Sequence, residues 1–236
     1  MSELITLRAE DGHSFSAWSS APLHECRGGV IVLHAVFGLT SHIGEVCDKW
    51  AAAGFKAIAP ALFDRLGENV IHPYGRTGAE AGSGSYGRLT HEQILTDVRA
   101  CQQALASFGP VAISGFCTGA SWAWTAAANL QFSAQVAFYG SHIHERLGEQ
   151  PLCPTQLHFG LLDHVVSRSE QERIAAAHPA LEMHIYEGAG HAFMNPEQEF
   201  FDANSAALAW RNALAFVETS FGLPGVHLTH FRRLET

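Results

Sequence analysis

One stretch of sequence decides the fold class, Val111-Ala112-Ile113-Ser114-Gly115-Phe116-Cys117-Thr118-Gly119, in which an apolar segment leads into a cysteine flanked by small residues. Residues 111–115 are typical of a buried strand, and residues 118–130 have helical spacing. A Gly-x-nucleophile-x-Gly segment between a strand and a helix is typical of a sharp, strained turn that exposes a nucleophile. The helix N-terminus would favour a thiolate at Cys117. The alternative is a buried, inert cysteine in a glycine-flanked turn, and this stretch alone does not decide between the two.

Outward from this stretch, apolar runs alternate with helical patterns along the chain. Strands are predicted at residues 29–33, 55–60, 111–115, 135–139, 155–159 and 182–186, and helices at 42–53, 90–108, 118–130, 169–177 and 200–216. Two alternating runs, residues 3–9 and 13–19, flank Asp11-Gly12 and predict an antiparallel hairpin. The order predicts an α/β fold with a mainly parallel central sheet and helices on both faces. We expect a single domain over residues 1–236, with a tail at approximately 222–236.

The segment of residues 62–89 is rich in glycine and polar residues and has no periodicity. We therefore expect a long loop, and such loops often carry function. Residues 82–85, Gly-Ser-Gly-Ser, are expected to be flexible and could act as a lid.

Composition excludes several functions. The 236 residues carry 14 Lys and Arg and a formal net charge of −9, which argues against a nucleic-acid partner. Neither a signal peptide nor a membrane-spanning stretch is evident, so a cytoplasmic protein without a membrane partner is expected. The five cysteines form no CxxC pair. His142 with His144 and His227 with His230 have ligand-like spacings but no obvious third ligand, so we expect no metal and no organic cofactor.

Two further segments follow predicted strands. Gly160-Leu161-Leu162-Asp163-His164 follows one, and Gly188-Ala189-Gly190-His191 follows the next. The chain order nucleophile, acid, histidine is the order that one large class of hydrolases uses. Cys117, Asp163 and His191 would all project from the carboxyl edge of one sheet, where open α/β folds bind ligands. They are the candidate catalytic residues.

At these motifs the chain resembles the dienelactone hydrolase family of the α/β-hydrolase superfamily. The resemblance is most specific at Gly-Phe-Cys-Thr-Gly, Leu-Asp-His and Gly-Ala-Gly-His-Ala-Phe. It implies an α/β-hydrolase fold, a triad of Cys117, His191 and Asp163, and hydrolysis of a carboxylated enol lactone without a cofactor. It also implies that the backbone N–H groups of Val36 and Thr118 bind the oxyanion.

Two positions depart from the family pattern. Ala35 stands where well-studied members have a glutamate, and Asn195 stands where they have an arginine that grips the substrate carboxylate. Arg65, Arg76 and Arg88 are alternative carboxylate grips, of which Arg88 is taken into the predicted pocket. The predicted substrate pocket comprises Ala35, Phe37, Arg88, His142 and Asn195.

The departures broaden the expected substrate to a small-molecule ester or lactone. A non-catalytic ligand-binding or redox-sensing protein on the same fold is the alternative. The sequence leaves the oligomeric state open.

Overall fold

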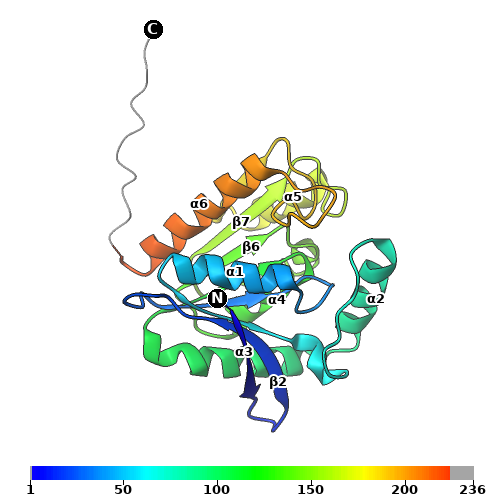
Figure 1. Ribbon diagram of the computed structural model, residues 1–236. Helices are drawn as coiled ribbons and strands as arrows, with labels where there is room; N and C mark the ends of the chain where they lie inside the picture. The colour runs from blue at the N-terminus through cyan, green and yellow to red at the C-terminus, as the bar shows by residue number, and fades with distance from the viewer. Residues whose placement is uncertain (1, 224–236) are drawn as a thin grey trace.

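A computed structural model describes residues 2–223 of the chain, and its centre is one eight-stranded sheet (Figure 1). The strands lie in the order β1-β2-β4-β3-β5-β6-β7-β8. Their bounds are β1 Glu3–Arg8, β2 Ser14–Ser20, β3 Gly29–Leu33, β4 Lys56–Pro60, β5 Val111–Phe116, β6 Ala134–Phe138, β7 Thr155–Gly160 and β8 Glu182–Tyr186. β2 pairs antiparallel with both β1 and β4, and all other pairs are parallel. The predicted hairpin and mainly parallel sheet are confirmed.

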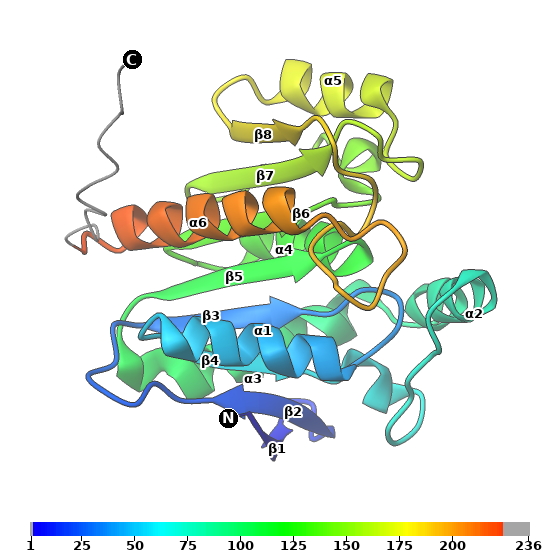
Figure 2. The same cartoon turned by 45° about the horizontal axis from the view of Figure 1, so that its top comes forward.

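Helices cover both faces of the sheet, as Figure 2 shows for α1 and α6 in front of the strands and α3 and α4 behind them. The bounds are α1 Ser41–Ala52, α2 Arg76–Gly87, α3 His91–Leu105, α4 Thr118–Asn129, α5 Arg168–Ala177 and α6 Ala203–Ser220, with short 3-10 helices at Leu62–Arg65 (η1), Ala106–Phe108 (η2) and Ile143–Glu145 (η3).

The residues of β3 show how both faces are buried. Val30 and Val32 pack in the core beneath α1 and α6, whereas Ile31 and Leu33 pack in the core beneath α3. Side chains alternate between faces along a strand, so a strand buried on both sides must be apolar throughout. This is why continuous apolar runs predicted the central strands.

The prediction of a plain loop over residues 62–89 is wrong. Residues 62–65 form η1 and residues 76–87 form α2, which includes the Gly-Ser-Gly-Ser segment. Glycine disfavours helices, but here it permits close packing. A Cβ atom on Gly78 would lie 1.7 Å from the carbonyl oxygen of Pro73, and one on Gly82 would lie 1.8 Å from that of Val36. Gly78 and Gly82 therefore lie on the face of α2 that packs against the protein, where an amphipathic helix would have large apolar residues.

The last helix begins three residues later than predicted, where the Asp202 side chain accepts a hydrogen bond from the Ser205 N–H group. Of the tail predicted at 222–236, residues 224–236 lie outside the described part, as do His227 and His230. Within residues 2–223, no helix has the length and apolar character needed to cross a membrane.

Candidate active site

Cys117 occupies a strained turn between β5 and α4. Its φ and ψ angles are 53° and −121°, a conformation that costs a non-glycine residue about 1–3 kcal/mol. Two glycines make the turn possible, because a Cβ atom would lie 2.4 Å from a backbone oxygen at Gly115 and 2.3 Å from one at Gly119. The Cys117 N–H group donates to the Phe138 carbonyl oxygen at 3.0 Å, which ties the turn to β6. The sulfur is thereby held at the carboxyl edge of the sheet.

Asp163 and His191 lie in the loops that follow β7 and β8. The His191 Nδ1–H group donates to the Asp163 carboxylate, at 2.9 Å from Oδ2 and 3.1 Å from Oδ1. Asp163 Oδ1 also accepts from the N–H groups of Val165 and Val166, at 2.8 and 2.9 Å. The carboxylate is therefore fixed by its own loop, and it fixes the imidazole with Nε2 available for chemistry.

Cys117 and His191 each favour the charged form of the other side chain. Burial raises the pKa of the Cys117 thiol and is the largest single influence, but the positive charge of His191 and hydrogen bonds from His191, Ser141 and Thr118 together leave that pKa below its ordinary value. Burial lowers the pKa of the His191 imidazole, but the Cys117 thiolate and the Asp163 carboxylate outweigh it and leave that pKa raised. His191 Nε2 has no hydrogen-bond partner among residues 2–223. Both shifts favour a thiolate–imidazolium pair, and Nε2 is free to form a new hydrogen bond.

Two hydroxyl groups add to the stabilisation of the thiolate. Thr118 Oγ1 lies 3.9 Å from Cys117 Sγ and 3.2 Å from Ser141 Oγ. Both hydroxyl groups lower the pKa of the thiol. Ser141 had no recognisable signal in the sequence.

We expect the rate of Cys117 alkylation by iodoacetamide to fall with decreasing pH at an inflection that lies below that of an ordinary thiol, because the pKa of Cys117 is lowered. An ordinary thiol has a pKa of about 8.5, so its alkylation would already be slow at neutral pH. In His191→Gln the opposing charge is lost while burial remains, so the inflection should move above about 8.5. Mass spectrometry of Cys117 across a pH series measures both curves, and coincident curves would contradict the ion pair.

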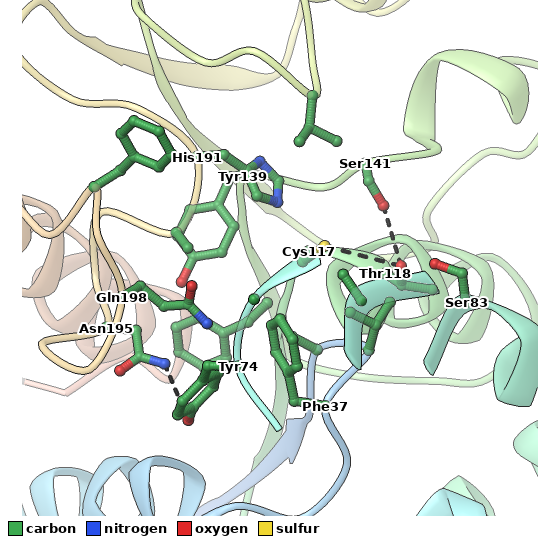
Figure 3. Close-up of a pocket in the computed structure, with 18 of the residues that line it drawn as sticks. Phe37, Tyr74, Ser83, Cys117, Thr118, Tyr139, Ser141, His191, Asn195 and Gln198 are labelled. Atoms are coloured by element: carbon green, nitrogen blue, oxygen red, sulfur yellow. Dashed lines mark hydrogen bonds between the residues drawn. The ribbon is translucent and has the colours of Figure 1, made fainter. Parts of the chain in front are cut away.

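Cys117 and His191 line a pocket of about 810 Å³, and Asp163 lies behind His191 outside the pocket wall. Figure 3 shows Cys117, His191 and Tyr139 on one side of the pocket and Phe37 and Tyr74 on the other. Most of its wall is apolar or aromatic. The predicted pocket residues Ala35, Phe37, His142 and Asn195 all lie on it. Residues that the sequence did not single out for the pocket are Tyr74, Tyr139, Ser141 and Gln198.

The arginine part of the pocket prediction is wrong for Arg88, which is exposed at the end of α2 and does not line the pocket. Arg65 is occupied elsewhere, in a bidentate pair with Asp97 at 2.7 and 2.9 Å. Arg76 lies at the pocket rim with a 93% exposed side chain bonded to Glu80.

The segment that carries Val36 is held from beneath by His34. The Leu62 N–H group donates to His34 Nε2 at 3.3 Å, so the proton sits on Nδ1, which lies 2.7 Å from the Ala35 carbonyl oxygen. Burial lowers the pKa of His34 to about 4, so the ring is neutral. His34 is absent from the pocket wall and does not replace the glutamate of the family pattern.

The N–H groups of Val36 and Thr118 form no hydrogen bond with any acceptor in the described chain. Thr118 is the first residue of α4, where an N–H group has no partner within the helix. Both residues line the pocket beside Cys117. The two groups are therefore available to a ligand.

Among residues 2–223, no three His, Cys, Asp or Glu side chains come together in a way that could hold a metal ion. His142 and His144 are engaged with carboxylates instead: His142 Nδ1 lies 3.3 Å from Glu145, and His144 Nε2 lies 3.2 Å from Glu170.

Known proteins of the dienelactone hydrolase type are similar in sequence to almost the whole chain. A carboxymethylenebutenolidase of Pseudomonas putida is 26% identical over 227 residues, which cover 92% of this chain and 96% of that protein. A second carboxymethylenebutenolidase, from Pseudomonas sp. strain P51, is 27% identical and covers 89% of this chain and 92% of its own length.

The fold has close structural counterparts. A crystal structure from Klebsiella pneumoniae, assigned as a dienelactone hydrolase, superimposes with a TM-score of 0.82 at 24% identity over 92% of this chain and 98% of its own. The sequence profile of the dienelactone hydrolase family matches residues 15–221. The match covers the sheet from β2 to β8 and every element of the pocket, and the chain accordingly belongs to the dienelactone hydrolase family and is a hydrolase of that type.

Proposed function

We propose that the protein opens an ester or lactone, with the Cys117 thiolate as nucleophile, His191 as general acid and base, and Asp163 as the group that orients His191. The observation that carries this proposal is the His191–Asp163 hydrogen bond of 2.9 Å, in the same pocket as a cysteine on a strained turn. The lowered pKa of the thiol and the raised pKa of the imidazole support it.

In the first half-reaction, Cys117 Sγ attacks the acyl carbon and forms a tetrahedral adduct. The N–H groups of Val36 and Thr118 are the proposed donors to its oxyanion, and losing one such donor costs about 10²–10³ in rate. His191 Nε2 then donates its proton to the departing alcohol, and a thioester remains on Cys117. Asp163 stabilises the imidazolium without taking a proton itself.

In the second half-reaction, His191 removes a proton from water, and the resulting hydroxide attacks the thioester carbon. The C–S bond breaks, the acid leaves, and the thiolate–imidazolium pair is restored. A thiolate leaves readily, so the first adduct reverts unless the alcohol is also a good leaving group. The reaction therefore favours enol lactones and aryl esters over alkyl esters and amides.

The family relation supports a small carboxylic ester or lactone as substrate, because the similar Pseudomonas proteins are carboxymethylenebutenolidases. Ala35 and Asn195 are both on the pocket wall and carry no charge. The carboxylated lactone of the family is therefore not carried over to this chain.

Rapid mixing with p-nitrophenyl acetate tests the proposal. We expect a burst of nitrophenolate equivalent to one acyl group per Cys117, followed by steady turnover, because a thioester forms before it is hydrolysed. Acid quenching and peptide mass spectrometry should find one acetyl group on Cys117, and prior alkylation with iodoacetamide should remove both phases. A protein that is alkylated at Cys117 but shows neither burst nor turnover would be a binding or redox-sensing protein instead.

A further inference from the structure

Tyr139 presents a hydroxyl group to the pocket that the hydrolytic steps above do not use. It follows β6 directly and has a φ angle of 42°, which is uncommon for a tyrosine. The residue is 2% exposed, and its ring packs edge-on against His191 at 5.1 Å and Phe193 at 5.5 Å between ring centroids. The hydroxyl group forms no hydrogen bond with any residue in the range 2–223, and it is not sealed inside the protein. In Figure 3 it points away from His191 toward Gln198 and Tyr74.

Gln198 presents a second unused donor on the same wall. Its Nε2 group is buried and has no hydrogen-bond partner among the described residues. The loop that carries it is anchored, since the Gln198 N–H group donates to the Asn195 carbonyl oxygen at 3.0 Å. In Figure 3 the amide lies beside the Tyr139 hydroxyl, with its oxygen toward that hydroxyl and its nitrogen toward Tyr74. A buried donor without a partner costs about 1–3 kcal/mol, and a ligand oxygen that Nε2 meets after a small rotation of the half-buried Gln198 side chain would offset that cost.

The neighbouring Asn195 is committed to the protein itself. Its Nδ2 group donates to the Tyr74 hydroxyl oxygen at 3.2 Å, and its Oδ1 accepts from the Glu197 N–H group at 2.9 Å. Tyr74 in turn donates to Thr40 Oγ1 at 3.1 Å. Asn195 therefore braces the pocket wall, and the Tyr74 hydroxyl is also occupied.

No buried, permanently charged cation lines the pocket within the described chain. Arg76 is almost fully exposed and bonded to Glu80, and Glu199 adds a second carboxylate at the rim. His42 is a buried imidazole on the wall, but burial lowers its pKa to about 4 and leaves it neutral. A substrate carboxylate would lose its hydration here without gaining a counter-charge beyond the imidazolium of the reacting pair.

We propose that Tyr139 and Gln198 form a neutral donor subsite that binds an uncharged carbonyl oxygen of the substrate, such as that of a carboxamide or a ketone, in preference to a carboxylate. The proposal rests on the proposed hydrolytic function and specifies its substrate class. Two neutral donors offset the desolvation of a carbonyl dipole, whereas a carboxylate needs charge as well.

A series of p-nitrophenyl esters tests the subsite. The acyl part is trans-4-substituted cyclohexanecarboxylic acid, in which the substituent is a carboxamide, an isopropyl group of the same shape, or a carboxylate. The trans ring prevents the substituent from attacking the ester. We expect wild type to hydrolyse the carboxamide ester with a kcat/KM at least about tenfold above that of the carboxylate ester. The carboxamide-to-isopropyl ratio should fall about 3- to 10-fold in Tyr139→Phe and in Gln198→Leu.

Tyr186→Phe is the matched control, because the Tyr186 hydroxyl bonds to His158 and Asn212 and the residue does not line the pocket. Its ratio should equal that of wild type. Faster hydrolysis of the carboxylate ester by wild type, or unchanged ratios in both pocket variants, would overturn the subsite.

Binding separates the subsite from the proposed function. Methyl ketones of the same three acyl groups cannot be hydrolysed, and calorimetry measures their affinities directly. If no ester is turned over, the hydrolytic proposal fails. The subsite then stands if the carboxamide ketone binds more tightly than the isopropyl ketone and loses that preference in Tyr139→Phe, and it falls if the preference is absent.

Discussion

Cys117→Ala is expected to lower kcat for p-nitrophenyl acetate by about 10⁴–10⁶-fold, since removal of a nucleophile from a working triad costs rates of that order. The thiol supplies the atom that bonds to the acyl carbon, and no neighbouring group can take its place with the same geometry. The residual rate should be that of substrate held beside the N–H groups of Val36 and Thr118. Stopped-flow and steady-state release of nitrophenolate measure the loss.

The fold of Cys117→Ala should be unimpaired, because alanine fits where cysteine does and the turn is held by its glycines. Circular dichroism and thermal unfolding check this. Cys153→Ala is the matched control: that thiol is outside the pocket, and burial raises its pKa to about 11, so it is inert at neutral pH. Full activity in Cys117→Ala, or equal loss in both variants, would sink the assignment of the nucleophile.

Gly82→Ala is expected to lower kcat/KM by about 10²-fold and to destabilise the protein by about 1–3 kcal/mol. The new methyl group would lie 1.8 Å from the Val36 carbonyl oxygen, so either α2 or the Val36 segment must move by more than an ångström. That segment carries a proposed oxyanion donor, and a displaced donor loses its transition-state contact. Hydrolysis kinetics and chemical denaturation measure the two effects.

Gly84→Ala makes the same chemical change in the same helix, two residues away. A Cβ atom at Gly84 would have no atom within 4 Å, so the substitution should stabilise α2 by about 0.5–1 kcal/mol and leave kcat/KM unchanged. Similar losses of activity in both variants would show that Val36 is not held by the contact with Gly82.

The central strands and the three candidate catalytic residues were predictable because each depends on local sequence. Buried parallel strands read as apolar runs, and the turn at Cys117 needs glycines at fixed positions. Asp163 and His191 could be found because each follows its strand directly. The distances from His191 Nδ1 to the two Asp163 carboxylate oxygens are 2.9 and 3.1 Å, and no sequence pattern specifies such a contact.

The helix α2 and the polar wall of the pocket were not predictable for a physical reason. Helices are predicted from the periodicity of apolar residues. The packing face of α2 instead carries Gly78 and Gly82, whose lack of a side chain allows the helix to approach neighbouring backbone closely. Tyr139 and Gln198 are ordinary residues in the sequence, and their free donors become evident only when every neighbour's hydrogen bonds are known. Arg88 was misplaced for the same reason, because its direction depends on a helix that had been taken for a loop.

The division of labour around the pocket has a consequence for protein engineering. The proposed catalytic residues lie on short turns at the ends of β5, β7 and β8, whereas α2 and the segment around residues 195–200 line other parts of the pocket. Replacing α2 and residues 195–200 with the equivalent segments of a relative should therefore change the substrate specificity and leave the proposed catalytic residues unchanged. Loop and helix grafting at these two segments is thus a direct way to alter the substrate selectivity of the protein.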